Sequence, residues 1–313
     1  MTTHTIPTGE PHPEHLGRER WLRATRPAFL SITAVGYALG VVNLSATLAD
    51  WLAVGVGLIA ALLLHAAANV INDVADADNG TDAANEQRIF PFTGGSRFIQ
   101  NGVLSARHMH RFAQYLILSA MLLGVGLWLW CGWGIVLLGM IGVFVAWAYS
   151  MPPLKLNSRG LGEGCVFVGF GLLPIGSHFV GSGDWDLQTA ILASSYALLT
   201  TALLYINQFP DRQADARAGK RHWVTRLSLQ SAPWGYVLLC GGAYLAVAVG
   251  SLITHWLPQW SALALLTLPL SVRASLNLLR YAAHPNQLGR AIRFTILAAH
   301  LHGVLLAVGV WLG

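Results

Sequence analysis

A run of acidic and amide residues follows directly after a long apolar segment. Residues 69–82 read NVINDVADADNGTD, and the preceding run Leu52–Ala68 contains no charged residue. Four aspartates beside hydrocarbon are costly unless positive charge meets them, because carboxylates are poorly solvated there. On a helix Asn69, Asp73 and Asp76 share one stripe, since they are spaced i, i+4 and i+7. The stretch is compatible with a solvated helix end, but its hard oxygen ligands also predict a Mg²⁺ site.

The composition places most of the chain in a lipid bilayer. Of the 313 residues, 54% are apolar and 11% are charged, whereas a soluble domain carries about 25% charged residues. Residues 1–27 contain no apolar run, so no cleavable signal peptide is expected. Cys131, Cys165 and Cys240 lie in apolar segments without paired spacing, which favours small core residues over disulfides or metal ligands.

Apolar segments of uniform length define the domain. Residues 1–26 are polar and end in a basic run, which predicts a tail leading to an interfacial helix start. From Pro27 onward each apolar segment is close to the ~20 residues that a helix needs to cross ~30 Å of hydrocarbon. We predict an all-α polytopic membrane protein, in which residues 27–313 form one bundle of nine transmembrane helices around a cytoplasm-facing active-site cavity. The nine segments are 28–48, 51–71, 109–129, 132–150, 161–180, 188–207, 232–254, 259–281 and 291–312.

The basic residues predict an orientation. All 19 Lys and Arg residues fall in alternate connections or in the helix turns that border them. The other connections, near Asp50, Gly132, 181–187 and 255–258, contain none. This distribution predicts a cytoplasmic N-terminus and active site and an external C-terminus, in the bacterial inner (plasma) membrane. It also argues that the formal charge of +5 does not indicate a nucleic-acid partner.

A second acidic cluster matches the first. Asn207, Asp211 and Asp215 are spaced i, i+4 and i+8 at the cytoplasmic end of the sixth segment, and Pro210 would kink that helix or begin a new one. Two acidic stripes at one depth repel each other unless cations lie between them. The pair suits a diphosphate held through Mg²⁺, with the metal stabilising the charge that develops on the leaving group. Long apolar helices around it would house a lipid tail.

Three motifs carry a family resemblance over residues 20–313. The stretches NDVADADNGTD at 72–82 and DRQADARAGK at 211–220 resemble the two aspartate motifs of the UbiA superfamily of intramembrane prenyltransferases. The stretch YSMPPLK at 149–155 resembles the Tyr-Ser-x-Pro-Pro-Leu-Lys loop of the same superfamily. The order of the motifs and their places at helix ends make the set specific.

Further details resemble the 1,4-dihydroxy-2-naphthoate (menaquinone-type) branch. The stretches TGGSR at 93–97 and GLGE at 160–163 are similar to segments of that branch. The 4-hydroxybenzoate branch would show Arg-Thr-x-x-Arg-Pro-Leu after the first motif, where this chain has QRIFPFT at 87–93. Pro210 and the pair His222-Trp223 depart from the branch pattern.

The resemblance implies roles for the acidic and amide residues. One Mg²⁺ would be bound by the first motif and a second by the other motif, with the asparagines fixing the carboxylates or contacting phosphate. For the aspartates and the asparagines, polar contacts between membrane helices are an alternative. Asp78 lies off the stripe and is expected to face solvent. The metal ligands are Asp73, Asp76, Asp82, Asp211 and Asp215, and the asparagines are Asn69, Asn72 and Asn207.

Basic side chains would bind the diphosphate. Lys155 and Arg159 follow a stiff Pro-Pro turn that would aim them at it, although they could equally be ordinary positive-inside residues. Arg97, Lys220 and Arg221 are candidate diphosphate clamps, with lipid headgroups as the alternative partners. Arg26 opens the first helix, where a headgroup contact is expected.

The remaining candidates concern the reacting groups. Tyr149 would stabilise an allylic cation, with an interfacial tyrosine as the alternative. Ser150 follows it and is expected to contact substrate. Glu163 would accept a proton or a hydrogen bond from the aromatic acceptor, or would simply favour a helix N-terminus.

The predicted activity is Mg²⁺-dependent transfer of a polyprenyl group from polyprenyl diphosphate to an aromatic acceptor in the membrane. 1,4-Dihydroxy-2-naphthoate in menaquinone biosynthesis is the expected acceptor. Alternative acceptors for the same chemistry are 4-hydroxybenzoate, homogentisate, a glycerol lipid or a tetrapyrrole. An ion or organic-anion transporter is disfavoured, because both acidic clusters lie at one end rather than at the membrane midplane. The prenyl chain length and the oligomeric state are not predicted.

Overall fold

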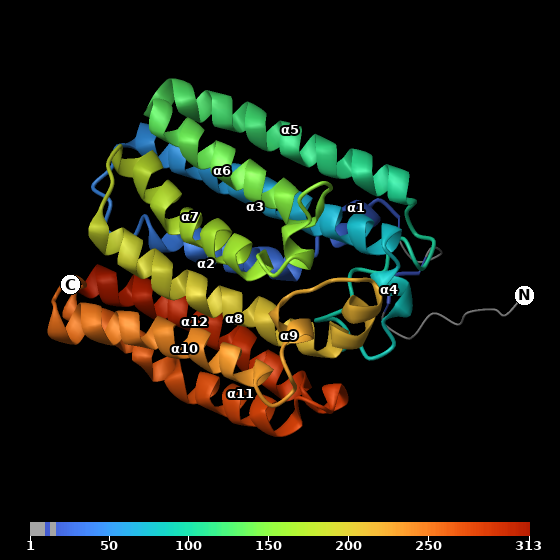
Figure 1. The fold of residues 1–313 in the computed structure, drawn as a ribbon. Coiled ribbons are helices and arrows are strands. Elements are labelled where there is room, and N and C mark those ends of the chain that lie inside the picture. The colour runs from blue at the N-terminus through green and yellow to red at the C-terminus, as the bar shows by residue number, and fades with distance from the viewer. Residues whose placement is uncertain (1–9, 13–16) are drawn as a thin grey trace, which may run out of the picture.

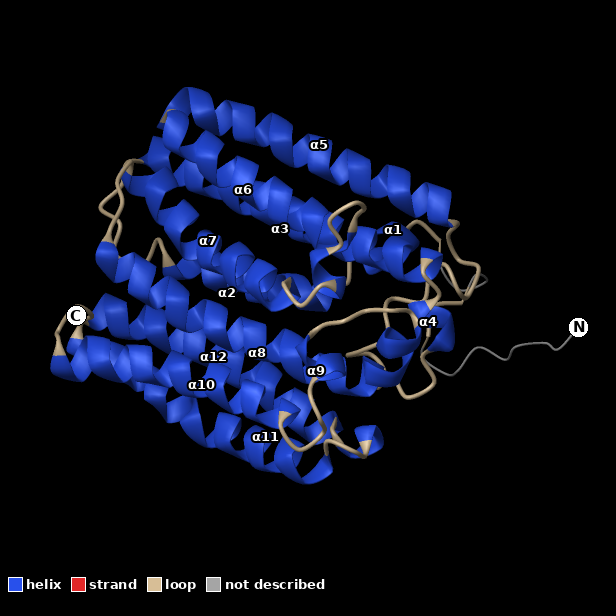
Figure 2. Cartoon of the chain, viewed as in Figure 1, coloured by secondary structure: helices blue, strands red, loops and turns tan. Residues whose placement is uncertain are grey.

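Helices make up all the regular structure of the part of the chain that is described, residues 10–12 and 17–313 of a computed structural model (Figure 2). Within those residues eight helical segments are long and apolar enough to cross a membrane. The predicted all-α class is confirmed. The eight segments are Leu48–Asp78, Ala106–Cys131, Trp133–Ser150, Gly162–Ser182, Leu187–Arg217, Ala232–Ile253, Gln259–Tyr281 and Gly289–Leu312.

The first predicted span is shorter than expected. It forms helix α2, Pro27–Leu39, which has only 13 residues and ends at Gly40. A Cβ at Gly40 would collide with the carbonyl oxygen of Pro174, so the chain can approach α7 (Gly162–Ser182) only at this glycine. The following turn is fixed by Asn43, whose Nδ2 donates to the carbonyl oxygen of Val310 at 2.7 Å.

Helix α8 (Leu187–Arg217) forms the centre of the bundle and is the most buried of the membrane-length helices. In Figure 1 helices from the N-terminal part lie on one side of it and helices from the C-terminal part on the other. Tyr196 of α8 is fully buried and donates a 2.5 Å hydrogen bond to the carbonyl oxygen of Ile32 on α2. The first group comprises α2, α3 (Leu48–Asp78), α5 (Ala106–Cys131), α6 (Trp133–Ser150) and α7, and the second comprises α10 (Ala232–Ala248), α11 (Leu268–Tyr281) and α12 (Gly289–Leu312).

The two longest helices carry the two acidic motifs. Helices α3 and α8 have 31 residues each, so each is about 47 Å long at 1.5 Å per residue and exceeds the ~30 Å hydrocarbon thickness. The motif residues begin only after about 20 residues of either helix. The surplus turns therefore bring both motifs to the same end of the bundle, where the short helices α4 (Thr81–Ala84) and α9 (Trp223–Arg226) also lie (Figure 1).

Two further predictions concern Pro210 and the N-terminal tail. Helix α8 runs through Pro210 without interruption, so the proline does not begin a new helix. Of the predicted polar tail, residues 1–9 and 13–16 lie outside the described residues. The described part includes helix α1, Glu19–Ala24.

Candidate active site

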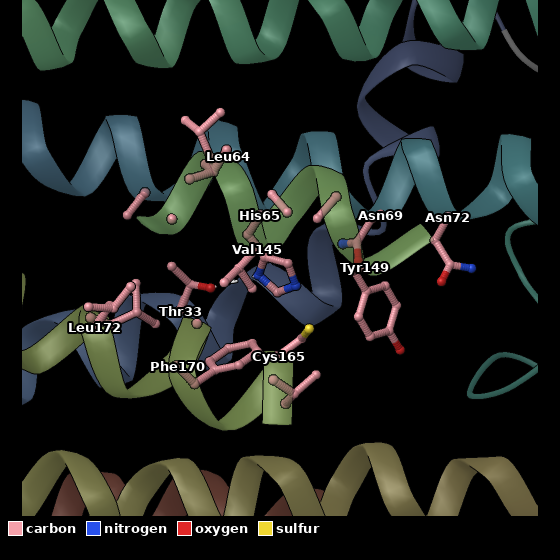
Figure 3. A pocket seen from close by; sticks show the side chains of 18 of the residues that line it. Thr33, Leu64, His65, Asn69, Asn72, Val145, Tyr149, Cys165, Phe170 and Leu172 are labelled. Atoms are coloured by element: carbon pink, nitrogen blue, oxygen red, sulfur yellow. Dashed lines mark hydrogen bonds between the residues drawn. The ribbon is translucent and has the colours of Figure 1, made fainter. Parts of the chain in front are cut away.

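A cavity of about 910 Å³ opens inside the bundle between α3, α5, α6, α7 and α8. One end is polar and is lined by residues of both acidic motifs, among them Asp76 and Asp211. The rest is apolar and follows α6 back to Trp133 at the start of that helix. Figure 3 shows Tyr149, His65 and Phe170 extending into the space between these helices. A charged headgroup and a long apolar chain would thus find separate regions in one cavity.

Lys220 joins the two acidic motifs. Its Nζ lies 2.7 Å from Asp76 Oδ1 on α3 and 3.0 Å from Asp215 Oδ1 on α8. Burial alone would lower the pKa of Lys220, but the two carboxylates raise it overall, so the ammonium stays charged. The predicted repulsion between the acidic stripes is thereby offset by a cation from the chain itself.

Arg26 plays a similar part for the first motif. Its guanidinium pairs with Oδ1 of Asp73, and the backbone N–H of Ser96 donates to the same oxygen at 3.3 Å. The expectation of a headgroup contact for Arg26 is therefore wrong, because the backbone before Pro27 turns its side chain into the bundle. Asp73 Oδ2 is buried and has no hydrogen-bond partner among the described residues.

The Gly94-Gly95 loop ties the two motifs together through the backbone. The N–H of Gly94 donates to Asp211 Oδ2 at 3.3 Å, and Asn85 Nδ2 donates to Asp211 Oδ1 at 2.6 Å. Gly95 has φ +74°, and a Cβ there would collide with the carboxylate of Asp82. Only glycine allows the loop to lie this close to both acidic motifs.

Asp82 lies close to the Asp73 and Asp76 carboxylates of the first stripe. Its Oδ2 accepts a 3.2 Å hydrogen bond from Gln100 Nε2, while Arg97 donates to its backbone carbonyl oxygen rather than to the carboxylate. Burial, followed by the neighbouring Asp76 and Asp73 carboxylates, raises the pKa of Asp82 to about 8. Arg97 does not line the cavity, so its predicted contact with diphosphate stays a prediction.

His222 contacts the second motif. This residue departs from the branch pattern, and its buried Nε2 lies 3.0 Å from Asp215 Oδ2. Asp215 is therefore contacted on both oxygens, by Lys220 on one and His222 on the other. The carboxylate is fixed in one orientation.

The three predicted asparagines line the cavity and differ in their hydrogen-bond partners. Asn72 Nδ2 donates to Asp76 Oδ2 at 2.7 Å, and Asn69 Nδ2 donates to the carbonyl oxygen of Thr25 at 3.0 Å. Asn207 also lines the cavity, but its buried Oδ1 has no partner among the described residues. Ser150 is buried behind Asn72 and donates to its Oδ1 at 3.5 Å.

The Tyr149–Gly160 region divides into inner and outer residues. Tyr149 and Asn157 line the cavity, whereas Lys155 and Arg159 are exposed and lie outside its lining. Arg159 instead donates to the carbonyl oxygen of Pro153 at 2.7 Å. The geometry brings neither basic side chain to the acidic motifs, and their diphosphate contacts stay a prediction.

Some residues of the cluster were not identified from the sequence. Asn85, Gly94 and Gln208 contact the aspartates or the cavity through packing between distant segments, which no local pattern reveals. The position of Arg26 could have indicated its role. It directly precedes the first apolar segment and Asp73 directly follows the second, so both lie at the same membrane surface. His222 was noted in the sequence only because it departs from the branch pattern, and its contact with Asp215 was not predicted.

The carboxylate oxygens of the two acidic motifs are suitable ligands for Mg²⁺. The aspartates offer hard carboxylate oxygens, and the unpartnered Asp73 Oδ2 is free to accept a cation. Among residues 10–12 and 17–313, however, no three acidic, histidine or cysteine side chains converge as a ready-made metal site. Arg26 and Lys220 neutralise the carboxylates instead. Binding of metal would require these two cations to move to other partners.

Comparison with known proteins agrees with this geometry. Residues 29–309 match the sequence profile of the UbiA prenyltransferase family. The 2-carboxy-1,4-naphthoquinone phytyltransferase of Synechocystis sp. is 26% identical, with 95% of this chain and 94% of the relative covered. The 1,4-dihydroxy-2-naphthoate octaprenyltransferase of Escherichia coli is 29% identical, with 94% and 96% covered.

A solved structure shares the fold. The UbiA homologue from Archaeoglobus fulgidus bound to GPP and Mg²⁺ superposes with a TM-score of 0.57 at 13% identity, with 92% of this chain and 99% of that chain covered. The matched profile spans nearly all of the helical bundle and both acidic motifs. The chain therefore belongs to the UbiA prenyltransferase family.

Proposed function

We propose that the protein transfers a polyprenyl group from polyprenyl diphosphate to an aromatic acceptor, 1,4-dihydroxy-2-naphthoate in menaquinone biosynthesis. The observation that carries the proposal is the pair of aspartate stripes on α3 and α8, bridged by Lys220 at the polar end of an apolar cavity. The naphthoate acceptor is supported by relatives named for a dihydroxynaphthoate or a carboxynaphthoquinone acceptor, which match over nearly the whole chain.

The acidic motifs and their cations would bind the diphosphate. Mg²⁺ held by Asp73, Asp76, Asp82, Asp211 and Asp215 would neutralise the charge that develops on the departing diphosphate. Lys220 and Arg26, which neutralise these carboxylates, would then turn to the diphosphate oxygens as charge-assisted donors. The backbone N–H groups of Gly94 and Ser96 keep Asp211 and Asp73 in place.

The apolar walls and Tyr149 would govern the chemical step. Cleavage of the C–O bond leaves an allylic cation, which the aromatic face or hydroxyl of Tyr149 stabilises. Attack by the electron-rich ring forms the new C–C bond, and loss of a proton, or of CO₂ from a naphthoate, restores aromaticity. The apolar lining excludes water from the cation.

The direct test supplies purified protein in detergent with labelled prenyl diphosphate and a panel of aromatic acids, and identifies the product by mass. We expect a prenylated naphthalene product that disappears on metal chelation and returns with added Mg²⁺. A product from 4-hydroxybenzoate or homogentisate alone would reassign the acceptor. The absence of any transfer to an aromatic ring would overturn the proposal.

We also propose that the active-site end faces the cytoplasm, because the Lys and Arg residues concentrate in the connections at that end. The C-terminus lies at the opposite end of the bundle from α4 and α9 (Figure 1). A reporter enzyme active only outside the cytoplasm should be active when fused to Gly313. Activity of a cytoplasm-only reporter at the same position would reverse the orientation.

A further inference from the structure

Glu163 and Gln208 form a buried pair beside the cavity. Gln208 Nε2 donates to Glu163 Oε1 at 3.1 Å, which joins the first turn of α7 to α8. Each residue is only 9% exposed. The remaining oxygens, Glu163 Oε2 and Gln208 Oε1, have no hydrogen-bond partner among the described residues.

Both unpartnered atoms are oxygens that accept hydrogen bonds. Asn207 Oδ1, on the residue next to Gln208, is a third buried oxygen without a partner. Leaving buried acceptors unpaired costs free energy, most of all at a carboxylate. The group is therefore complementary to a ligand that brings hydrogen-bond donors and no negative charge at this point.

Gln208 lies in the same cavity as the second aspartate motif and Tyr149. Gln208 and Asn207 line the cavity, and Gln208 precedes Asp211 by three residues, which is about one helical turn of ~5.4 Å. Tyr149 extends into the cavity from helix α6 (Figure 3). A ligand bonded to Gln208 would thus lie in the same cavity as Tyr149, about one helical turn from Asp211.

We propose that Glu163 and Gln208 form the acceptor subsite and receive the phenolic hydroxyl hydrogens of a dihydroxylated aromatic ring. This inference rests on the proposed function and adds what the site recognises. Gln208 holds one oxygen of Glu163, and the other oxygen is buried without a partner and is available to accept from the ligand. A hydroxyl that donates to a carboxylate gains electron density, and the ring carbons become more nucleophilic. The contacts select free hydroxyls over ethers and over acceptors that carry phosphate here.

The test compares two variants with a matched control. Gln208→Leu removes the amide acceptor, and Glu163→Gln keeps the side-chain volume while removing the charge. Gln213→Leu changes an exposed glutamine on the same helix and serves as the control. We expect KM for 1,4-dihydroxy-2-naphthoate to rise at least tenfold in both variants. KM for prenyl diphosphate should stay within twofold of the wild type, and the control should change neither constant.

A methylated acceptor separates recognition from a structural role. In the wild type, the monomethyl ether of the dihydroxy acceptor should have a kcat/KM at least tenfold lower than the free diol. In Gln208→Leu and Glu163→Gln this preference should shrink toward unity, because the first variant removes the amide acceptor and the second replaces the carboxylate with a neutral, weaker acceptor. An unchanged preference in folded variants, or a parallel rise of both KM values, overturns the subsite. A wild type that prenylates no aromatic ring instead overturns the proposed function itself.

Discussion

Replacement of Asp73 or Asp211 by asparagine should lower Mg²⁺-dependent prenyl transfer about 100-fold or more, the usual loss when one electrostatic stabiliser of the transition state is removed. Each aspartate is the middle residue of its helical stripe, and each is fixed by a backbone N–H of the 94–96 loop. Asparagine keeps the size of the side chain but removes the charge that would bind metal. The measurement is product formation by mass spectrometry at saturating prenyl diphosphate and varied Mg²⁺.

Asp78 provides the matched control for these variants. It belongs to the same motif, but it is exposed and lies off the stripe formed by Asp73 and Asp76. Asp78→Asn should therefore retain nearly full activity. Full Mg²⁺-dependent transfer by folded Asp73→Asn or Asp211→Asn would contradict the assignment of the acidic motifs.

Replacement of Lys220 by methionine should destabilise the metal-free protein and weaken prenyl transfer. The side chain bridges Asp76 and Asp215, so its removal leaves two buried carboxylates without their shared cation. Loss of one partner of a buried ion pair costs about 3–5 kcal/mol. Thermal unfolding in detergent should show a melting temperature several degrees lower without Mg²⁺. Added Mg²⁺ should recover part of the loss, because a divalent cation can take over the role of counter-ion.

The neighbouring Arg221 serves as the control for Lys220. It is exposed, and the structure shows only its backbone N–H bonded, to the carbonyl oxygen of Ser158 at 2.8 Å. Arg221→Met should leave the melting temperature and its response to Mg²⁺ unchanged. If Lys220→Met behaves like Arg221→Met, then the ammonium is not the cation that offsets the acidic motifs.

The resemblance predicted which aspartates belong to the site, but it did not predict which residues contact them. Asp76 and Asp215 were recognised because the spacing along a helix already aligns the motif side chains, and Lys220 because it ends the second motif. The partners of Asp211 were not predicted, since Asn85 and Gly94 lie 126 and 117 positions away. Lys155 shows the opposite case. The motif drew attention to it, but its backbone leaves the side chain exposed and away from the cavity lining.

The sequence alone determined the helical membrane class, eight of the nine predicted membrane-length segments and the presence of two acidic motifs at one end. Those features depend on apolar run length, on charge placement and on spacing within single helices, all of which are local. Tertiary structure decided which cation meets which carboxylate. Arg26 pairs with Asp73 across 47 positions, and Gln208 bonds to Glu163 across 45. Such contacts arise only when separate helices pack, because the depth and rotation of each helix are set by its neighbours.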